Sequence, residues 1–242
     1  MKFIFPGTKG EIEEENLKHK YHSSLIVEHM DTKILIDLGE KYSEKLNPIL
    51  NNFDALLITH AHPDHYIWTK KAKDDINIPV YLTEVTLNYS IYKPLSYTII
   101  EPNKEFKIKN LAIIPYKVIH SLRCPTVCFK IRGDKAVIYA PDILDTEEPK
   151  ENIFLGVETL IADGSSFDIN LVRKRGNKLF GHAMIKTEIG WCKKFNIPNL
   201  YITHCGKQII ESNEKEMETK IYKVTGDQVN FKIAFDGFKV EV

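Results

Sequence analysis

Cysteine, excess charge and long apolar runs are all scarce in this sequence, and each absence argues against a class of protein. The four cysteines among 242 residues form no Cys-x-x-Cys pair, which predicts small core thiols in a reduced, cytoplasmic setting. Lys and Arg number 33 together, as do Asp and Glu, so no global field attracts nucleic acid or a membrane. No apolar run approaches the ~18 residues of a membrane span. We therefore expect a soluble protein with no membrane partner.

The sequence also shows no sign of a domain boundary. The chain has no internal repeat, no low-complexity tract and no Gly/Ser-rich linker. A length of 242 residues fits one domain of the larger α/β kind, with enough chain to bury a sizeable core. We therefore expect a single domain over residues 1–242.

The apolar pattern predicts strands in two batches with helices between them. In the first half we expect strands at 2–5, 23–28, 33–37, 55–58 and 79–82, and helices over 43–50, from Asp64, and from Thr83. In the second half we expect strands at 106–108, 111–118, 126–131, 135–139, 157–162, 200–203, 229–235 and 238–242, and helices over 184–195 and 211–224. This order predicts two sheets covered by helices on their outer faces.

The most informative stretch follows the strand at 55–58, which runs directly into His60, His62, Asp64 and His65. On an extended backbone residues i and i+2 point the same way, so His60 and His62 can reach one metal. Asp64 and His65, one turn further on, would face a second metal. Imidazoles and a carboxylate without cysteine suit zinc or a similar borderline cation. The alternative, a polar loop with stray histidines, does not explain such a density of ligands.

Three more polar residues stand just beyond buried strands. His120 follows the strand at 111–118, Asp142 the strand at 135–139, and His204 the strand at 200–203. Such strand ends are where α/β proteins place ligand sites, because the strand is rigid and the loop is exposed. We interpret the remaining N-terminal histidines as ordinary surface or sheet residues: His19, His22 and His29.

Together with Asp37 in Ile36-Asp37-Leu38-Gly39, these positions resemble, in order, the metal motifs of the metallo-β-lactamase superfamily. The resemblance covers nearly the whole chain and implies an α/β protein with a four-layer αββα sandwich and a two-metal site along one edge. It implies a first metal held by His60, His62 and His120, and a second held by Asp64, His65 and His204. Asp142 would bridge the two metals, and Asp37 would fix a ligand histidine from behind.

Two departures narrow the activity that this resemblance implies. The best-known β-lactamases of the superfamily have a cysteine where this chain has Asp142, so antibiotic hydrolysis is not expected. The di-iron flavoproteins of the same fold have a glutamate at the position of His62, which disfavours oxygen or nitric oxide reduction.

The C-terminal half is similar to ribonuclease Z. Asp163 lies in a segment like the one in which those enzymes carry a glutamate, and Gly181-His182 is similar to the motif of their catalytic histidine. The likeness implies that Asp163 orients His182 and that His182 protonates the leaving oxygen. The alternative is that Asp163 caps a turn and His182 caps the helix that follows.

A basic segment lies between these two residues. Arg173-Lys174-Arg175-Gly176-Asn177-Lys178 puts four cations on an expected loop, where they would hold the phosphate or the strand that flanks it. A solvated loop is the equally weighted alternative. The interval from His120 to Asp142 is too short for the transfer-RNA-binding arm of ribonuclease Z. A compact relative, such as the phosphodiesterase of the phosphonate-degradation operon, is therefore the closer likeness.

We accordingly expect a phosphodiesterase that acts on a small or cyclic phosphodiester or on a nucleic-acid end. Two divalent ions, zinc or else manganese, would share the attacking hydroxide, with Asp64 in the catalytic site and His182 as general acid. The alternatives are a lactone or thioester hydrolase on the same metals, or a non-catalytic module that binds metal or docks nucleic acid. The segment 81–104, rich in tyrosine, would form a pocket wall or the subunit contact of a homodimer.

Overall fold

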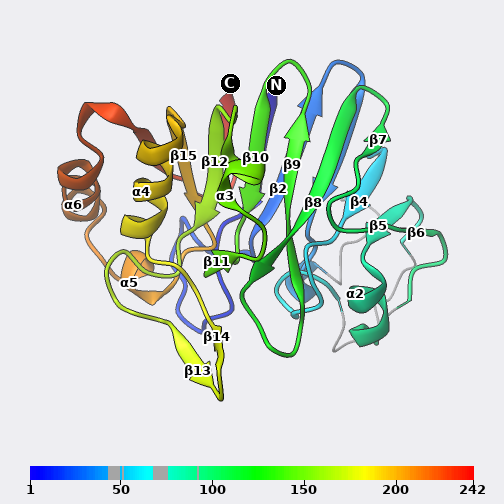
Figure 1. Ribbon diagram of the computed structural model, residues 1–242, viewed down its shortest axis with the longest axis horizontal. Helices are drawn as coiled ribbons and strands as arrows, with labels where there is room; N and C mark the ends of the chain where they lie inside the picture. Colours follow the sequence, from blue (N-terminus) through cyan, green and yellow to red (C-terminus); the bar gives the residue numbers. More distant parts are fainter. Residues whose placement is uncertain (43–49, 51, 68–75, 92) are drawn as a thin grey trace.

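The architecture consists of two mixed β-sheets packed face to face, seen in a computed structural model that describes residues 1–42, 50, 52–67, 76–91 and 93–242 (Figure 1). The first sheet contains β1 (Lys2–Gly7), β2 (Ser24–His29), β3 (Thr32–Ile36), β4 (Ala55–Leu57), β5 (Val80–Leu82), β6 (Tyr97–Ile99) and β17 (Lys239–Glu241). Their spatial order is β17-β1-β2-β3-β4-β5-β6. The strands from β3 to β6 run parallel, and the others pair antiparallel.

The second sheet contains β7 (Phe106–Ile108), β8 (Leu111–Ile119), β9 (Thr126–Arg132), β10 (Ala136–Ala140), β11 (Asp145–Thr146), β12 (Thr159–Asp163), β15 (Asn199–Thr203) and β16 (Asn230–Ile233). Their order is β11-β8-β9-β10-β12-β15-β16, with β7 paired to β8. The strands from β10 to β16 along this path are parallel. Their carboxyl ends therefore share one edge of the sheet, and that edge carries the polar residues described below.

Alternating side chains separate the layers. In β3, Ile34 and Ile36 enter the core between the two sheets, while Leu35 lies in an apolar layer on the outer face of the first sheet. A third apolar layer lies on the outer face of the second sheet and includes Ile138 and Leu160. Because successive residues of a strand point to opposite faces, a strand buried on both faces must be apolar throughout. The continuous apolar runs of this sequence meet that requirement.

Helices complete the four layers, so the predicted α/β αββα sandwich is confirmed. The second sheet is covered by α3 (Lys150–Phe154), α4 (Ile185–Phe195), α5 (Lys207–Ile210) and α6 (Glu214–Thr225), and η2 (Gly226–Gln228) ends that layer. The described part of the other outer layer contains η1 (Glu40–Tyr42) and α2 (Glu84–Tyr89). Tyr42 and Leu87 pack there against the outer face of the first sheet.

The basic segment is not the loop that the sequence predicts. It forms a two-stranded antiparallel hairpin of β13 (Arg173–Arg175) and β14 (Lys178–Phe180), which projects from the bottom of the view in Figure 1. Gly176 makes the turn with φ +59°, a conformation that favours glycine. The two strands pair only with each other and join neither of the large sheets. Neither face of the hairpin is packed in the core, which explains why its sequence lacks the alternating apolar residues of a packed strand.

Two predicted helices differ from the structure, and a third lies outside the described residues. The helix predicted to start near Asp64 is absent from the described residues 64–67, where the N–H groups of His65 and Tyr66 both donate to the His62 carbonyl and close a tight turn. The rest of that prediction falls on residues 68–75, which lie outside the described residues. The helix predicted over 211–224 begins later, at Glu214, because the Asn213 side chain accepts from the Glu216 N–H and caps it. The helix predicted over 43–50 falls on undescribed residues, apart from the helical, buried Leu50.

Two histidines interpreted as surface or sheet residues are buried in loops. The segment with Tyr21 and His22 pairs with Thr8 and Lys9, just after β1, and His19 and His22 are less than a tenth exposed. Gly39 makes this packing feasible, because a Cβ there would stand 2.2 Å from the Asp64 carbonyl oxygen and 2.8 Å from His22 Nδ1. The Asp-Leu-Gly motif thus ends in the small residue that the close approach of two loops demands.

All four cysteines are free thiols and buried, as expected. No helix in the described part of the chain is long and apolar enough to cross a membrane. Segment 81–104 supplies β5, α2 and β6, and none of its described residues lines the large cavity described below. A subunit contact through this segment stays a prediction.

Candidate metal centre and catalytic site

All seven histidines and aspartates assigned to the metals meet at the shared edge of the two sheets. The loop after β4 carries His60, His62, Asp64 and His65. The residues from the second sheet each follow a strand: His120 after β8, Asp142 after β10 and His204 after β15. Their ligand atoms fall into two groups, each within 4.8 Å: the three histidines His60, His62 and His120, and the four residues Asp64, His65, Asp142 and His204.

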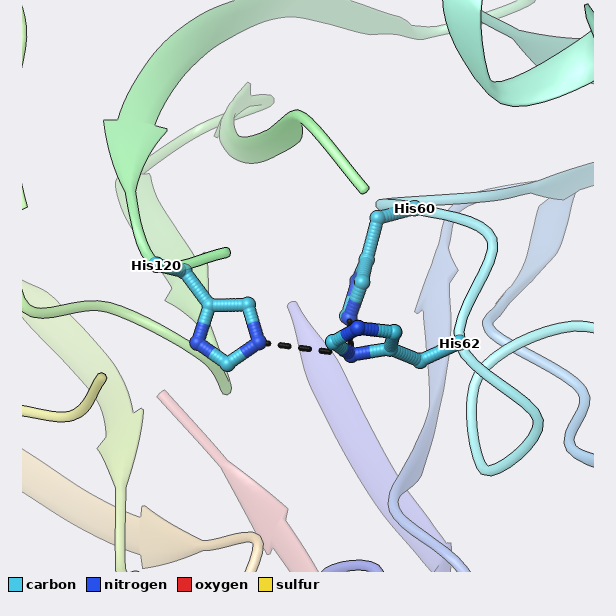
Figure 2. Close-up of side chains that lie close together, drawn as sticks. All are labelled: His60, His62 and His120. Carbon is cyan, nitrogen blue, oxygen red and sulfur yellow. Dashed lines mark hydrogen bonds between the residues drawn. The ribbon is translucent and has the colours of Figure 1, made fainter. Parts of the chain in front are cut away.

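In the first group three imidazole rings point at one another (Figure 2). His60 Nε2 lies 2.9 Å from His62 Nδ1, and His120 Nε2 lies 3.4 Å from the same atom. Zinc–nitrogen bonds of ~2.0–2.1 Å in a tetrahedral site separate two nitrogen ligands by roughly 3.3 Å. The spacing of these nitrogens is therefore close to that of a tri-histidine zinc site.

In two of these rings, His60 and His120, the opposite nitrogen is held by a hydrogen bond. The Thr59 hydroxyl donates to Asp37, so it accepts from His60 Nδ1–H at 2.9 Å. His120 Nδ1–H donates to the Gly181 carbonyl at 3.1 Å. Each bond fixes the tautomer and leaves Nε2 as the free ligand atom, which is the usual outer-shell arrangement around a metal.

The second group gathers two carboxylates and two imidazoles. His65 Nε2 lies 2.6 Å from Asp142 Oδ2 and 3.1 Å from Asp64 Oδ2, and His204 Nε2 lies 3.1 Å from Asp64 Oδ2. His65 Nδ1–H donates to Asp37 at 2.8 Å, so the predicted outer role of Asp37 has a matching contact. Asp142 also lies 3.5 Å from His120 Nε2, which puts it between the two groups.

Backbone strain accompanies this geometry at two site residues. Asp37 has φ +61° and His204 has φ +51°, both in the left-handed region that few residues without a glycine's freedom adopt. Gly10 packs closely against the His204 ring, because a Cβ at Gly10 would stand 3.0 Å from the imidazole Cε1. Such outliers concentrate at functional sites, where the surrounding structure maintains them.

The first group is electrically neutral. Burial holds the pKa of His60 well below its usual value, lowers that of His62, and lowers that of His120 to about 4. These three imidazoles are therefore unprotonated near neutral pH. Neutral imidazole is the form of histidine that ligates a metal.

In the second group, the nearby carboxylates favour the protonated form of the two imidazoles. Burial opposes the charge on His65, but Asp64, Asp142 and Asp37 hold its pKa well above its usual range. Burial likewise opposes the charge on His204, but Asp142, Asp163 and Asp64 raise its pKa to about 10. The buried carboxyls of Asp64 and Asp142 keep a pKa well below the usual range because these imidazoles outweigh burial. A divalent cation is what such a concentration of buried negative charge accommodates.

Unsatisfied atoms show where a cation fits. Among the described residues, His65 Nε2, Asp64 Oδ1 and Asp142 Oδ2 are buried and make no well-formed hydrogen bond. Buried polar atoms are otherwise almost always paired, and metal ligation is one way of satisfying them. The donor sets, three imidazoles in one group and carboxylates with imidazoles in the other, suit two zinc-like ions.

The residues similar to the ribonuclease Z pair also meet. His182 Nδ1 lies 2.7 Å from Asp163 Oδ2, and His182 Nδ1 is also 3.1 Å from the Ser165 hydroxyl. Asp163 is the last residue of β12, fully buried, and accepts from the backbone N–H groups of Ile143 and Ser165. Burial opposes the charge on His182, but Asp163 raises its pKa above the usual value.

Behind this pair stands a residue that the sequence prediction missed. Glu188, on the first turns of α4, is completely buried, and its Oε1 accepts from the Asp163 N–H at 3.0 Å. Its Oε2 has no partner among the described residues. Burial, together with the charge of Asp163, holds the pKa of Glu188 well above its usual range, so it is a neutral acid. In the sequence it is indistinguishable from the solvated glutamates of other helices.

A cavity of about 1150 Å³ opens over the site. His62, His120, His182 and His204 lie at its floor or walls. Arg173 and Arg175 of the hairpin also line it, whereas Lys174 does not. Four further lining residues carry charge and were not singled out in the sequence: Glu11, Arg123, Lys207 and Glu211.

Comparisons with known proteins agree with this geometry. The model of the β-lactamase superfamily domain matches residues 16–221. Ribonuclease Z of Methanopyrus kandleri is 28% identical over 144 residues, which cover 54% of this chain and 50% of that protein. The chain thus matches about half the length of this curated relative.

Two solved structures are similar over almost their whole length. The metallo-β-lactamase fold protein YhfI from Bacillus subtilis superposes with a TM-score of 0.74 at 19% identity, covering 99% of this chain and 98% of that one. A diphosphatase from the PhnP family superposes with a TM-score of 0.72 at 17% identity, covering 100% and 97%. At these identities the likeness establishes the fold alone.

Proposed function

This chain belongs to the metallo-β-lactamase superfamily and is a metal-dependent hydrolase of that family, and we propose that the bond it hydrolyses is a phosphodiester. The observation that carries the proposal is the contact between His182 and Asp163 at 2.7 Å, beside the two ligand groups. Ribonuclease Z is named for cleaving RNA and the PhnP-family protein for cleaving a diphosphate, so both names denote hydrolysis at phosphorus, which supports the same choice.

Phosphodiester hydrolysis requires a proton donor on the leaving side. The oxygen of water bonds to phosphorus, one P–O ester bond breaks, and the departing alkoxide must take a proton because it is a poor leaving group. His182 is positioned to supply this proton, because Asp163 accepts from Nδ1 and Nε2 is then the nitrogen available to the cavity. The charge of Asp163 raises the pKa of His182 against the effect of burial, which favours the protonated ring that a general acid requires.

The remaining roles follow from position. Two bound divalent ions supply the ionisation of a water near neutral pH and the neutralisation of charge on the phosphate oxygens. His60, His62 and His120 would hold one ion, and Asp64, His65 and His204 the other, with Asp142 between them. Asp37 holds His65, and through Thr59 it holds His60, so that both rings present Nε2 to the ions.

A substrate panel tests the proposal. The zinc-loaded and the manganese-loaded protein are assayed with bis-p-nitrophenyl phosphate, a thioester and a lactone. We expect the phosphodiester to be turned over with a higher kcat/KM than either carbonyl substrate, because two bound divalent ions would neutralise the charge on the phosphate oxygens. Preferred turnover of the thioester or lactone would assign the site to carbonyl hydrolysis instead. Absence of turnover on all three would favour a non-catalytic metal-binding module.

A further inference from the structure

Arginine is rare in this chain and concentrated at one place. Of the 33 basic residues only four are arginines: Arg123, Arg132, Arg173 and Arg175. Three of these four line the cavity over the metal site, where the only lysine among the described lining residues is Lys207. Arginine differs from lysine in presenting a planar fork of donors that binds phosphate through two hydrogen bonds at once. Its placement here points to a ligand with phosphate-like oxygens.

None of the three cavity arginines has a carboxylate partner among the described residues. In contrast, the fourth arginine, Arg132, pairs with Glu105 on the surface. The lining lysine, Lys207, pairs with Glu14 at 2.5 Å and Glu211 at 3.5 Å. Three uncompensated cations around one cavity repel one another until an anion binds between them.

Both arginine-bearing segments are attached to the metal site by short links. Arg123 stands three residues beyond His120, in the loop after β8. The hairpin ends at Gly181, whose N–H donates to the His120 carbonyl at 2.7 Å and whose carbonyl accepts from His120 Nδ1–H at 3.1 Å. The loop and the hairpin are thus joined at their bases, next to His120 and His182.

The hairpin presents its arginines to the cavity on one face. Arg173 pairs directly with Phe180, and residues opposite each other in an antiparallel pair lie on the same face. Arg173, Arg175 and Phe180 all line the cavity, whereas Lys174 belongs to the opposite face. A substrate group that reaches this wall meets two guanidinium groups and an aromatic ring.

Carboxylates also line the cavity. Glu11 follows Gly10, which packs against the His204 ring, and Glu211 pairs with Lys207. The hairpin that carries Arg173 and Arg175 instead leads through Gly181 directly into His182. An additional anionic group beside the leaving oxygen would therefore be attracted to these arginines.

We propose that Arg123, Arg173 and Arg175 bind a second phosphate, carried by the part of the substrate that leaves with the proton from His182. This inference rests on the proposed phosphodiesterase function and names its substrate class: a phosphodiester whose leaving alcohol carries another phosphate group. The cavity, at about 1150 Å³, exceeds the ~300–1,000 Å³ of ordinary small-molecule sites, so it has room for two phosphates and the group that joins them.

Binding tests the second phosphate site without any catalytic step. The zinc-loaded protein is titrated calorimetrically with thymidine 3′,5′-bisphosphate, thymidine 5′-phosphate and thymidine 3′-phosphate at low ionic strength. We expect the bisphosphate to bind at least about tenfold more tightly than either monophosphate, because charge-assisted arginine–phosphate bonds are strong. The R123Q/R173Q/R175Q variant should lose that advantage, and R132Q, which removes the arginine outside the cavity, should keep it. Equal affinities for all three ligands, or an advantage that survives the triple substitution, would overturn the proposal.

Cleavage tests the direction. The dinucleotide thymidylyl-thymidine is compared with its forms that carry a terminal 3′- or 5′-phosphate, and the products are identified by mass. We expect the preferred form to release the terminal phosphate on the fragment that leaves as an alcohol. Release of that phosphate on the fragment that keeps the scissile phosphorus would contradict the assignment. Failure of the proposed function would look different: bis-p-nitrophenyl phosphate and all three dinucleotides would stay intact, while the calorimetric result would still decide the arginine site.

Discussion

Asp163 Oδ2 lies 2.7 Å from His182 Nδ1, on a carboxylate that two backbone N–H groups hold in place. Because Asp163 is fully buried and ends a strand, it cannot swing away, and the imidazole that it binds is held in one orientation. This contact distinguishes the site from one that only binds two cations, and the first prediction follows from it.

His182→Ala should lose about 10²–10⁴-fold in kcat on a dialkyl phosphodiester, the usual range for a general acid. The loss on bis-p-nitrophenyl phosphate should be much smaller, because p-nitrophenolate leaves without a proton. Metal content, measured by plasma mass spectrometry, should stay at that of the unsubstituted protein. Equal losses on the two substrates would mean that His182 does not protonate the leaving oxygen.

Asp64→Ala should reduce the bound zinc from two ions per chain to one. Asp64 Oδ2 lies about equally close to His65 and His204, at 3.1 Å from each Nε2, so its removal dismantles the second group and spares the tri-histidine group. Asp168→Ala removes a carboxylate that is exposed and paired with Lys186 outside the ligand groups, and serves as the control. Two zinc ions per chain in Asp64→Ala would remove this residue from the ligand set.

Glu188→Gln should change the free energy of unfolding by no more than about 1 kcal/mol, because a neutral amide oxygen can still accept from the Asp163 N–H. Glu188→Ala should cost about 2–4 kcal/mol, since it leaves a cavity and an unpaired buried N–H. Urea unfolding of the two variants measures the difference. A glutamine variant as unstable as the alanine variant would show that Glu188 is ionised in the folded protein.

His22 should make the protein less stable in mild acid. Burial lowers its pKa to about 4, below the unfolded value of about 6.5, and Asp64 only partly opposes that shift. Above pH 6.5 both states are neutral and the residue contributes nothing to pH dependence. Between pH 6.5 and 4, His22 binds a proton in the unfolded state but not in the folded state. The free energy of unfolding therefore falls as the pH falls, by about 2–3 kcal/mol at pH 4.5.

His22→Asn tests this sign. Unfolding in urea is measured at pH 7 and pH 4.5 in the presence of EDTA, so that metal release does not contribute. The drop in free energy between the two pH values should be smaller in the variant by about 2–3 kcal/mol, whatever the stability of the variant at pH 7. An identical drop in both proteins would mean that His22 is charged in the folded state.

The sequence predicted the site better than its surroundings, for physical reasons. Asp142 and His204 each follow a short, continuous apolar run, and such runs form buried parallel strands whose ends meet at one edge. His120 follows β8, which pairs antiparallel with its neighbours and reaches the same site. The αββα layers follow from the same runs. Strand ends are thus readable from local sequence.

What the sequence did not predict depends on contacts between distant segments. The hairpin over 173–180 has no apolar alternation, because its strands pair only with each other. Glu188 is buried only because α4 covers the end of β12, and His22 only because its loop folds beneath Gly39. The turn at Asp64 forms because the His62 carbonyl accepts two backbone N–H groups. None of these contacts has a local signal.

The most direct test of phosphodiester hydrolysis at this site compares kcat/KM of the zinc-loaded protein on a dialkyl phosphodiester before and after Asp163→Asn. The amide cannot stabilise a protonated imidazole, so the pKa of His182 should fall. The alkaline limb of the pH profile should then move to lower pH, with a loss of at least about tenfold near neutral pH. An unchanged rate and pH profile, with both zinc ions still bound, would contradict the account.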